Sequence, residues 1–159
     1  MNKRPLFPDD FIVLEGLTTD RMRLRMLTIH DVVKDFDAVM SSKDRLQTVF
    51  RPGSTWPDGL TLEQNLIDLG WHQYEFQNGT SFCYTVVALD EAQILGCVYI
   101  YPADHLGHDA QISMWVRQSE AETGLDDHLF ETVQAWIARD WPFRNPGYPG
   151  RTSDWTDWR

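Results

Sequence analysis

Three side chains that could bind a metal or move a proton, His105, His108 and Asp109, lie within five residues of one another. Imidazole and carboxylate groups are common zinc ligands, but no further ligand nearby completes a set. Two histidines in a polar segment are more often solvated, so we expect no metal. Ser113 and Cys97 could act as nucleophiles, yet neither stands in a Gly-x-Ser-x-Gly turn or next to a histidine, and both are expected in the core.

Another segment carries four carboxylates within eight residues, on Glu120, Glu122, Asp126 and Asp127. The sequence Thr-Gly-Leu-Asp, which begins at Thr123, resembles a capping box there. In a capping box, side-chain oxygens accept hydrogen bonds from the free amides at the start of a helix. The pattern therefore predicts a helix with an acidic first turn.

The chain up to residue 40 predicts a strand followed by a helix. Residues 21–26 alternate charged and apolar side chains, which is the period of a half-buried strand. Residues 28–31 form a capping pattern, after which apolar side chains recur along one helical face. This face consists of Val32, Val33, Phe36, Val39 and Met40.

A second helix is expected after a stretch of turns. Residues 41–59 contain two turn signals and should form a loop with one helical turn. Thr61 then starts a capping pattern, and the helix should end near residues 78–79. Its expected apolar face consists of Leu62, Leu66, Ile67 and Leu69.

Strands dominate the next part of the chain. Residues 81–89 and 94–101 flank a short polar turn and predict an antiparallel hairpin, and residues 110–116 form a further strand candidate. A helix over residues 125–139 and a short strand near Phe143 complete the order. Because this is not a repeating βαβ pattern, we expect an α+β (α/β) fold: one domain with a mixed, mostly antiparallel central sheet flanked by helices.

Size and composition favour one globular domain. The chain has 159 residues, of which 42% are hydrophobic and 13% aromatic, enough to build a substantial core. Residues 1–20 lack a helical period and are expected to form an N-terminal extension packed on a domain of residues 21–159, with residues 11–14 as a candidate short strand.

Cys83 and Cys97 lie in apolar segments and are expected to be buried free thiols.

The charge excludes several classes of partner. A formal net charge of -10 and a pI near 4.7 argue against binding to nucleic acid or to an anionic membrane surface, and favour amines. No signal-peptide pattern follows the N-terminus, and no apolar run of about 18 residues occurs, so a cytoplasmic protein is expected.

Several short motifs, in order, resemble one known family. The run LTTDRMRLR at residues 17–25 is similar to the opening of proteins that acetylate the N-termini of ribosomal proteins. The hairpin around residues 95–98 and the segment 110–117 are similar to the second, third and fourth strands of the same group. Over roughly residues 17–148 the chain thus resembles the GCN5-related N-acetyltransferase (GNAT) superfamily, which implies a GNAT-like fold.

The resemblance also implies where acetyl-coenzyme A would bind. In the family, the backbone of the fourth strand contacts the pantetheine arm, and free amides at the start of the next helix hold the pyrophosphate. Of the family's usual Arg/Gln-x-x-Gly-x-Gly/Ala loop, only one glycine remains clearly. The corresponding residues are Trp115, Val116 and Arg117 for the arm, and Thr123, Gly124, Leu125 and Asp126 for the pyrophosphate.

Two interpretations of this acidic loop stay open. Like charges about 6 Å apart repel by roughly 0.7 kcal/mol even in water, so the carboxylates could weaken the binding of a polyanion. The Asp126 carboxylate could also occupy the anion site itself by capping the helix, so that self-capping with weakened coenzyme binding is one interpretation. Ordinary coenzyme binding remains the alternative to both effects.

The resemblance implies candidate catalytic residues as well. The carboxylate that the family places at the start of its fourth strand is Gln111 here, which cannot act as a base. His108 and Asp109 stand beside it and could relay a proton through water. The family often uses a late tyrosine to protonate the leaving thiolate, and Tyr148 is the candidate, although this chain ends earlier than the family pattern.

The leading hypothesis is an acetyl-coenzyme A dependent N-acetyltransferase that acts on the primary amine of a small molecule or peptide, by direct attack in a ternary complex. The alternative is a non-catalytic GNAT-like binding module that has lost coenzyme A binding. A homodimer also stays open. Aromatic residues near the second helix are expected in the core or around an acceptor pocket: Trp71, Tyr74, Phe76, Phe82 and Tyr84. Those in the tail, Trp155 and Trp158, should cover the domain or a second subunit.

Overall fold

The structure of the protein, a computed structural model, describes residue 7 and residues 11–158. The strands are β1 Gly16–Thr18, β2 Arg23–Met26, β3 Phe82–Val87, β4 Ile94–His105, β5 His108–Val116 and β6 Pro146–Gly147. The α-helices are α1 Val32–Met40, α2 Lys43–Val49, α3 Leu62–Gln77 and α4 Leu125–Asp140.

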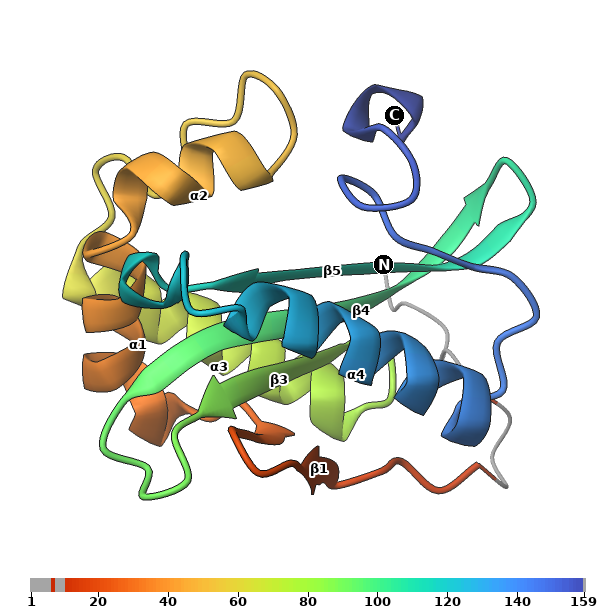
Figure 1. Cartoon of the computed structure of the whole chain (residues 1–159), viewed down its shortest axis with the longest axis horizontal. Coiled ribbons are helices and arrows are strands. Elements are labelled where there is room, and N and C mark those ends of the chain that lie inside the picture. Colours follow the sequence, from red (N-terminus) through yellow and green to blue (C-terminus); the bar gives the residue numbers. More distant parts are fainter. Residues whose placement is uncertain (1–6, 8–10, 159) are drawn as a thin grey trace.

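One sheet holds these strands in chain order, from β1 to β6. Neighbouring strands are antiparallel except β5 and β6, which are parallel and are joined through α4, as a parallel pair requires. Figure 1 shows α4 on one face of the sheet and α1 and α3 on the other. The expected single domain with a mixed, mostly antiparallel sheet flanked by helices is confirmed.

Each face of the sheet has its own core because strand side chains alternate between the faces. On β5, Ile112, Met114 and Val116 belong to the core under α4, whose buried side chains recur at helical spacing. Trp115 points to the opposite face and joins the core under α1 and α3. Burying each such side chain contributes about 1.5–3 kcal/mol, so β5 is fixed in register from both sides.

The first strand lies later in the chain than expected. Residues 11–14 form no strand, and β1 at residues 16–18 pairs with β2 instead. Phe7 and Phe11 pack against the ring of Trp141 in the core under α4. Of the extension expected at residues 1–20, residues 1–6 and 8–10 lie outside the described residues.

Two predicted helix faces were partly wrong. On α1, Val33 is 68% exposed while Asp35 is buried, and on α3 the buried residues are Asn65 and Leu69. The two helices meet through a polar contact, in which the Asn65 amide donates a 2.9 Å hydrogen bond to Asp35. Apolar periodicity cannot detect such a face. The apolar residues left exposed on α3 are Leu62, Leu66 and Ile67.

The last part of the chain returns across the sheet. The short strand is β6, at residues 146–147 rather than near Phe143, and residues 148–158 then run over the free side of β5 (Figure 1). We call residues 148–158 the C-terminal strap. Within the described residues, no helix is both long and apolar enough to cross a membrane.

The two cysteines are buried and free, as expected. Cys83 on β3 and Cys97 on β4 lie with their sulfur atoms 3.2 Å apart. Both belong to the core under α1 and α3. Ser113 is also buried, but it lines a cavity, as described below.

Candidate functional site

The sheet opens where β5 and β6 part. These strands pair only at Ala110 with Pro146 and at Gln111 with Gly147. Beyond this point the outer edge of β5 meets no strand of the described chain up to Val116. The N-terminus of α4 follows soon after, and its N-cap residue Gly124 has a left-handed backbone (φ 82°), which glycine adopts without strain.

Arginine side chains occupy this free edge. Arg151 of the strap donates a 3.4 Å hydrogen bond from Nη2 to the carbonyl oxygen of Met114. Arg45 of α2 donates a 3.1 Å hydrogen bond from Nε to the carbonyl oxygen of Val116. Two carbonyl groups that an extended ligand could use along β5 are therefore bonded within the chain.

The carboxylate of Asp126 binds these same arginines. Arg151 contacts both of its oxygens, at 2.6 and 2.8 Å, and Arg45 lies 3.8 Å from one of them. Asp126 does not cap the helix, since α4 has no side-chain cap at Gly124. The predicted self-capping by Asp126 is thus replaced by a bidentate ion pair, which holds the guanidinium group in a fixed plane.

A third arginine reaches the same loop. Arg21 donates a 3.1 Å hydrogen bond to the carbonyl oxygen of Thr123, whose hydroxyl group accepts a 3.3 Å hydrogen bond from the Leu125 amide. Three guanidinium groups therefore stand close to the acidic first turn of α4. The repulsion expected from the four carboxylates is offset by cations from distant parts of the sequence.

Two tryptophan side chains hold the C-terminal strap against the domain. The ring of Trp158 stacks on His108, with centroids 4.9 Å apart, and covers Gly147 so closely that a β-carbon there would lie 2.2 Å from the ring. Trp155 donates a 2.9 Å hydrogen bond to the carbonyl oxygen of Val49 at the end of α2. The tail tryptophans cover the domain, as expected.

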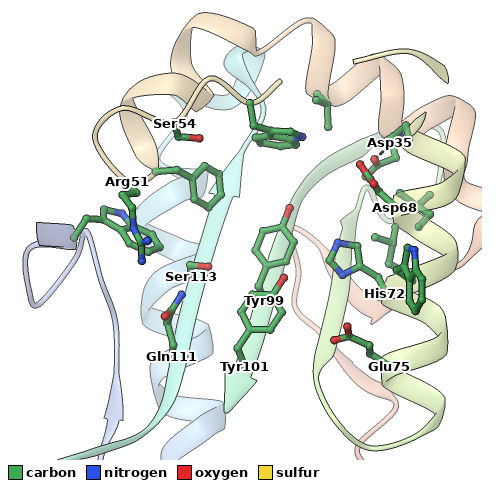
Figure 2. Close-up of a pocket in the computed structure, with 18 residues that line it drawn as sticks. Asp35, Arg51, Ser54, Asp68, His72, Glu75, Tyr99, Tyr101, Gln111 and Ser113 are labelled. Atoms are coloured by element: carbon green, nitrogen blue, oxygen red, sulfur yellow. Dashed lines mark hydrogen bonds between the residues drawn. The ribbon is translucent and has the colours of Figure 1, made fainter. Parts of the chain in front are cut away.

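A cavity of about 610 Å³ lies on the other side of β5, between β4 and α3. Figure 2 shows Tyr99 and Tyr101 in its middle, Gln111 and Ser113 on β5, and an acidic wall on the side of α3. The labelled polar side chains of the α1 and α3 wall are Asp35, Asp68, His72 and Glu75.

A smaller cavity of about 290 Å³ lies along the free edge of β5 and includes Asp126 and Arg151 in its lining. Phe50, Ser113 and Trp155 line both cavities. The two spaces therefore adjoin at Ser113. A group that enters along the edge of β5 would meet a molecule held in the larger cavity there.

Burial raises the pKa of the Asp35 carboxyl to about 6. The hydrogen bond from Asn65 opposes this shift, and the charges of Asp31 and Asp68 add to it. Burial also acts on Asp31, but hydrogen bonds from Arg25 hold its pKa below the ordinary value. In the described part of the chain, no lysine or arginine pairs with Asp35 in this way.

The two tyrosines in the cavity keep their protons. Burial raises the pKa of both Tyr99 and Tyr101 above the ordinary value. The indole of Trp115 donates a 2.9 Å hydrogen bond to the hydroxyl oxygen of Tyr99 and fixes its position. Each hydroxyl is therefore a proton donor at neutral pH.

The three predicted catalytic residues are not among those that line the two cavities. Asp109 accepts hydrogen bonds from the backbone amides of Arg144 (2.7 Å) and Asn145 (3.0 Å), which ties β5 to the segment before β6. His108 stacks on the strap, as described above. Tyr148 is buried in the core under α4, and burial raises its pKa to about 12.

The predicted coenzyme residues divide into two groups. Gly124, Leu125 and Asp126 stand at the N-terminus of α4, as the sequence suggested. The side chain of Arg117, however, is buried and turned away from the free edge: it donates hydrogen bonds to the carbonyl oxygen of Ile94 and to Asp37. It joins α1 to β4 and takes no part in either cavity.

The polar wall of the larger cavity was missed in the sequence. Asp68 and His72 are four residues apart on α3, and Glu75 follows three residues later, so the three share one helical face. This spacing was the available signal, but a polar helical face is usually solvated. Only the position of α3 over the sheet turns it towards a cavity.

Solved structures share this fold at low sequence identity. The ribosomal-protein-S5-alanine acetyltransferase from Vibrio fischeri has a TM-score of 0.61 and 14% identity, over 77% of this chain and 66% of that one. A ribosomal L7/L12 alpha-N-protein acetyltransferase in complex with coenzyme A has a TM-score of 0.64 and 18% identity, over 79% and 68% of the two chains. The microcin C7 self-immunity acetyltransferase, in complex with acetyl-CoA and AMP, has a TM-score of 0.60 and 14% identity, over 78% of this chain and 66% of that one.

These matches identify the fold as that of the GNAT acetyltransferases, notably those that modify ribosomal proteins. No family model and no curated protein matches the sequence. The chain spans about two thirds of the length of the structures named above. At these identities the likeness establishes the fold, and the activity has to be argued from the site.

Proposed function

We propose that this protein is an acetyl-coenzyme A dependent N-acetyltransferase that acts on a primary amine. The observation that carries the proposal is that the smaller cavity, which runs along the free edge of β5 to Asp126 of α4, adjoins the larger cavity at Ser113. A donor along the edge and an acceptor in the larger cavity would be held in one geometry. Such positioning is the main source of rate in a transfer between two bound substrates.

The residues at the free edge fit an anionic donor once Arg151 moves. Arg45 and Arg151 already converge on Asp126, so an arriving pyrophosphate would meet two guanidinium groups beside the amides of α4. Gly124 leaves the backbone accessible there. When Arg151 exchanges its carboxylate for a phosphate, it also releases the carbonyl oxygen of Met114.

The larger cavity supplies the groups that the transfer needs. Bound acetyl-coenzyme A supplies the acyl group as a thioester. His72 and Glu75 carry side chains that can accept the proton of the attacking amine, and the protonated hydroxyl groups of Tyr99 and Tyr101 can donate one to the leaving sulfur. In this proposal Asp109, His108 and Tyr148 hold the strap and β6 in place.

Calorimetry with acetyl-coenzyme A tests the proposal, followed by mass spectrometry of mixtures with primary amines. We expect saturable binding at or below millimolar coenzyme, and an amine that gains one acetyl group only when the protein is present. Absence of binding at millimolar coenzyme would overturn the enzymatic function.

A second candidate function is a binding module that uses the larger cavity without a coenzyme. The ion pair of Arg151 with Asp126 favours it, because this pair and the bond to Met114 close the edge of β5 in the structure. Binding of amines by a protein that ignores acetyl-coenzyme A would support the module.

A further inference from the structure

The two sides of the larger cavity carry opposite charges. Figure 2 shows Asp35, Asp68 and Glu75 on the side of α1 and α3, and Arg51 on the side of β5. Arg51 is held there by a 2.5 Å hydrogen bond to the carbonyl oxygen of Trp158. A ligand therefore experiences a field that attracts a cation to one end of the cavity and disfavours it at the other.

Asp35 is an independent sign that a cation belongs at the acidic end. Its side chain lines the cavity, yet the residue is only 4% exposed, and the hydrogen bond that it accepts from the described residues comes from the neutral amide of Asn65. A buried carboxylate without a cationic partner destabilises the folded state, because its charge has lost the solvation of water. A bound ammonium group would offset that cost, because it would supply the missing partner.

The middle of the cavity is aromatic. The rings of Tyr99 and Tyr101 stack with centroids 6.0 Å apart and planes 10° apart, and Trp56 and Trp71 also line the cavity. Such walls favour an apolar chain and also attract cations to the ring faces. A ligand that is polar along its whole length would not match them.

The distance between the two ends follows from the sheet. Ser113 is on β5, the tyrosines are on the neighbouring strand β4, and α3 packs on β3, the next strand along. Neighbouring strands lie about 4.8 Å apart, so the two ends of the cavity are separated by about 10 Å.

We propose that the acceptor is an extended aliphatic diamine: one amine lies over Ser113, and the second, as an ammonium group, lies between Asp35 and Asp68, with the carbon chain across the tyrosines. This inference names the substrate class of the proposed acetyltransferase and rests on that function. Arg51 disfavours the charged form of the amine at Ser113, so that this end is the neutral nucleophile.

The transfer balances with these groups alone. The neutral nitrogen at Ser113 forms a bond to the acyl carbon while the bond from that carbon to sulfur breaks. The nitrogen loses one proton to a base of the cavity, and the sulfur leaves as a thiolate that takes up one proton. The distant ammonium group does not react.

Equilibrium binding without any coenzyme tests the proposal. The probes are 1,8-diaminooctane, octylamine and 1,3-diaminopropane, measured by calorimetry at one pH and salt concentration. The eight-carbon diamine can span about two strand spacings, whereas the three-carbon diamine cannot. We expect 1,8-diaminooctane to bind at least about tenfold tighter than either of the other amines.

A pair of variants on one helix makes the test specific. Asp68→Asn removes a carboxylate of the cavity, and Glu63→Gln removes an exposed carboxylate of the same helix that does not line it. We expect Asp68→Asn to reduce the preference for the long diamine to less than about threefold, and Glu63→Gln to leave it unchanged.

The proposal is overturned if the three amines bind equally, if none binds, or if the preference survives in Asp68→Asn. These results do not depend on acetyl-coenzyme A. If the diamine binds as expected but no acetyl group is transferred, the substrate class stands for the cavity while the enzymatic function fails. If acetyl groups reach amines that carry no second charge equally well, the function stands and the diamine specificity fails.

Discussion

The buried carboxylate of Asp35 lowers the stability of the folded protein, although we propose that the same carboxylate binds the ligand's ammonium group. Its pKa is about 6 in the folded protein and near 3.8 in the unfolded chain. Between these values the folded protein holds a proton that the unfolded chain has released, so this residue makes the fold less stable as the pH rises through that window. Besides burial, the hydrogen bond from Asn65 and the charges of Asp31 and Asp68 act on the Asp35 carboxyl.

Replacement of Asp35 by Asn should therefore stabilise the protein at high pH. The asparagine can keep the hydrogen bond from Asn65 without the buried charge. We expect the free energy of unfolding, measured with urea, to rise by about 1–3 kcal/mol at pH 8 and to change little at pH 4. Binding of 1,8-diaminooctane should weaken at the same time. A variant less stable than the parent protein at pH 8 would contradict this account.

Asp126 controls access to the N-terminus of α4. Removing its carboxylate frees Arg45 and Arg151 to bind a phosphate group. It also removes the repulsion between this carboxylate and the two charges of a pyrophosphate, which is roughly 0.7 kcal/mol for each charge at about 6 Å. For Asp126→Ala we expect acetyl-coenzyme A to bind at least about tenfold more tightly in calorimetry.

Asp127→Ala is the matched control for this change. Asp127 is exposed in the same helical turn and contributes similarly to the helix dipole, but within residues 11–158 no ion pair joins it to an arginine. We expect its effect on coenzyme affinity to stay below about threefold. Equal effects of the two variants would mean that general charge, and not the pair with Arg151, limits binding.

At the scale of elements, the strap decides how open the edge of β5 is. Its position depends on Gly147 of β6, because the ring of Trp158 lies where a β-carbon of residue 147 would be. Gly147→Ala should push the ring away and destabilise the protein by about 1–3 kcal/mol in urea unfolding. Hydrogen exchange of the amides of residues 148–158 should become faster.

Gly70→Ala on α3 is the control for that experiment. A β-carbon there would lie 3.9 Å from its nearest neighbour, which is an ordinary contact. Alanine is also the better helix former, so this variant should be about 0.5–1 kcal/mol more stable than the parent protein. If both variants behaved alike, the contact between Gly147 and Trp158 would not be what holds the strap.

The elements were largely predictable because their signals are local. Thr61 caps α3 as its pattern indicated, by accepting a 3.1 Å hydrogen bond from the Gln64 amide. The strand candidate at residues 110–116 is part of β5, and the helix expected over residues 125–139 is α4. The faces of α1 and α3 were not predictable, because a polar contact between Asp35 and Asn65 joins residues 30 positions apart.

At the scale of the whole molecule, the net charge of -10 should assist the capture of a cationic amine. Raising the NaCl concentration from about 0.1 M to about 1 M shortens the screening length from about 10 Å to about 3 Å. We expect the affinity for 1,8-diaminooctane to fall by about tenfold over this range, while the uncharged 1,8-octanediol shows no such loss. An unchanged diamine affinity would contradict a role for charge.

The sequence by itself determined the order of the strands and helices other than β1 and α2, the single sheet and the acidic first turn of α4. These features follow from periodicity, capping and composition, which act between neighbouring residues. The sequence also contained Arg21, Arg45 and Arg151, but nothing local linked them to that turn.

Only the tertiary structure decided what the acidic turn does and where a ligand can bind. Folding brings Arg45 and Arg151 to Asp126 and changes a repelling carboxylate into the centre of an ion-pair cluster. It also turns Asp35 and Asp68 towards one cavity. Both outcomes depend on electrostatic contacts between residues that are distant in the chain, and such contacts form only once the sheet has set the positions of the helices.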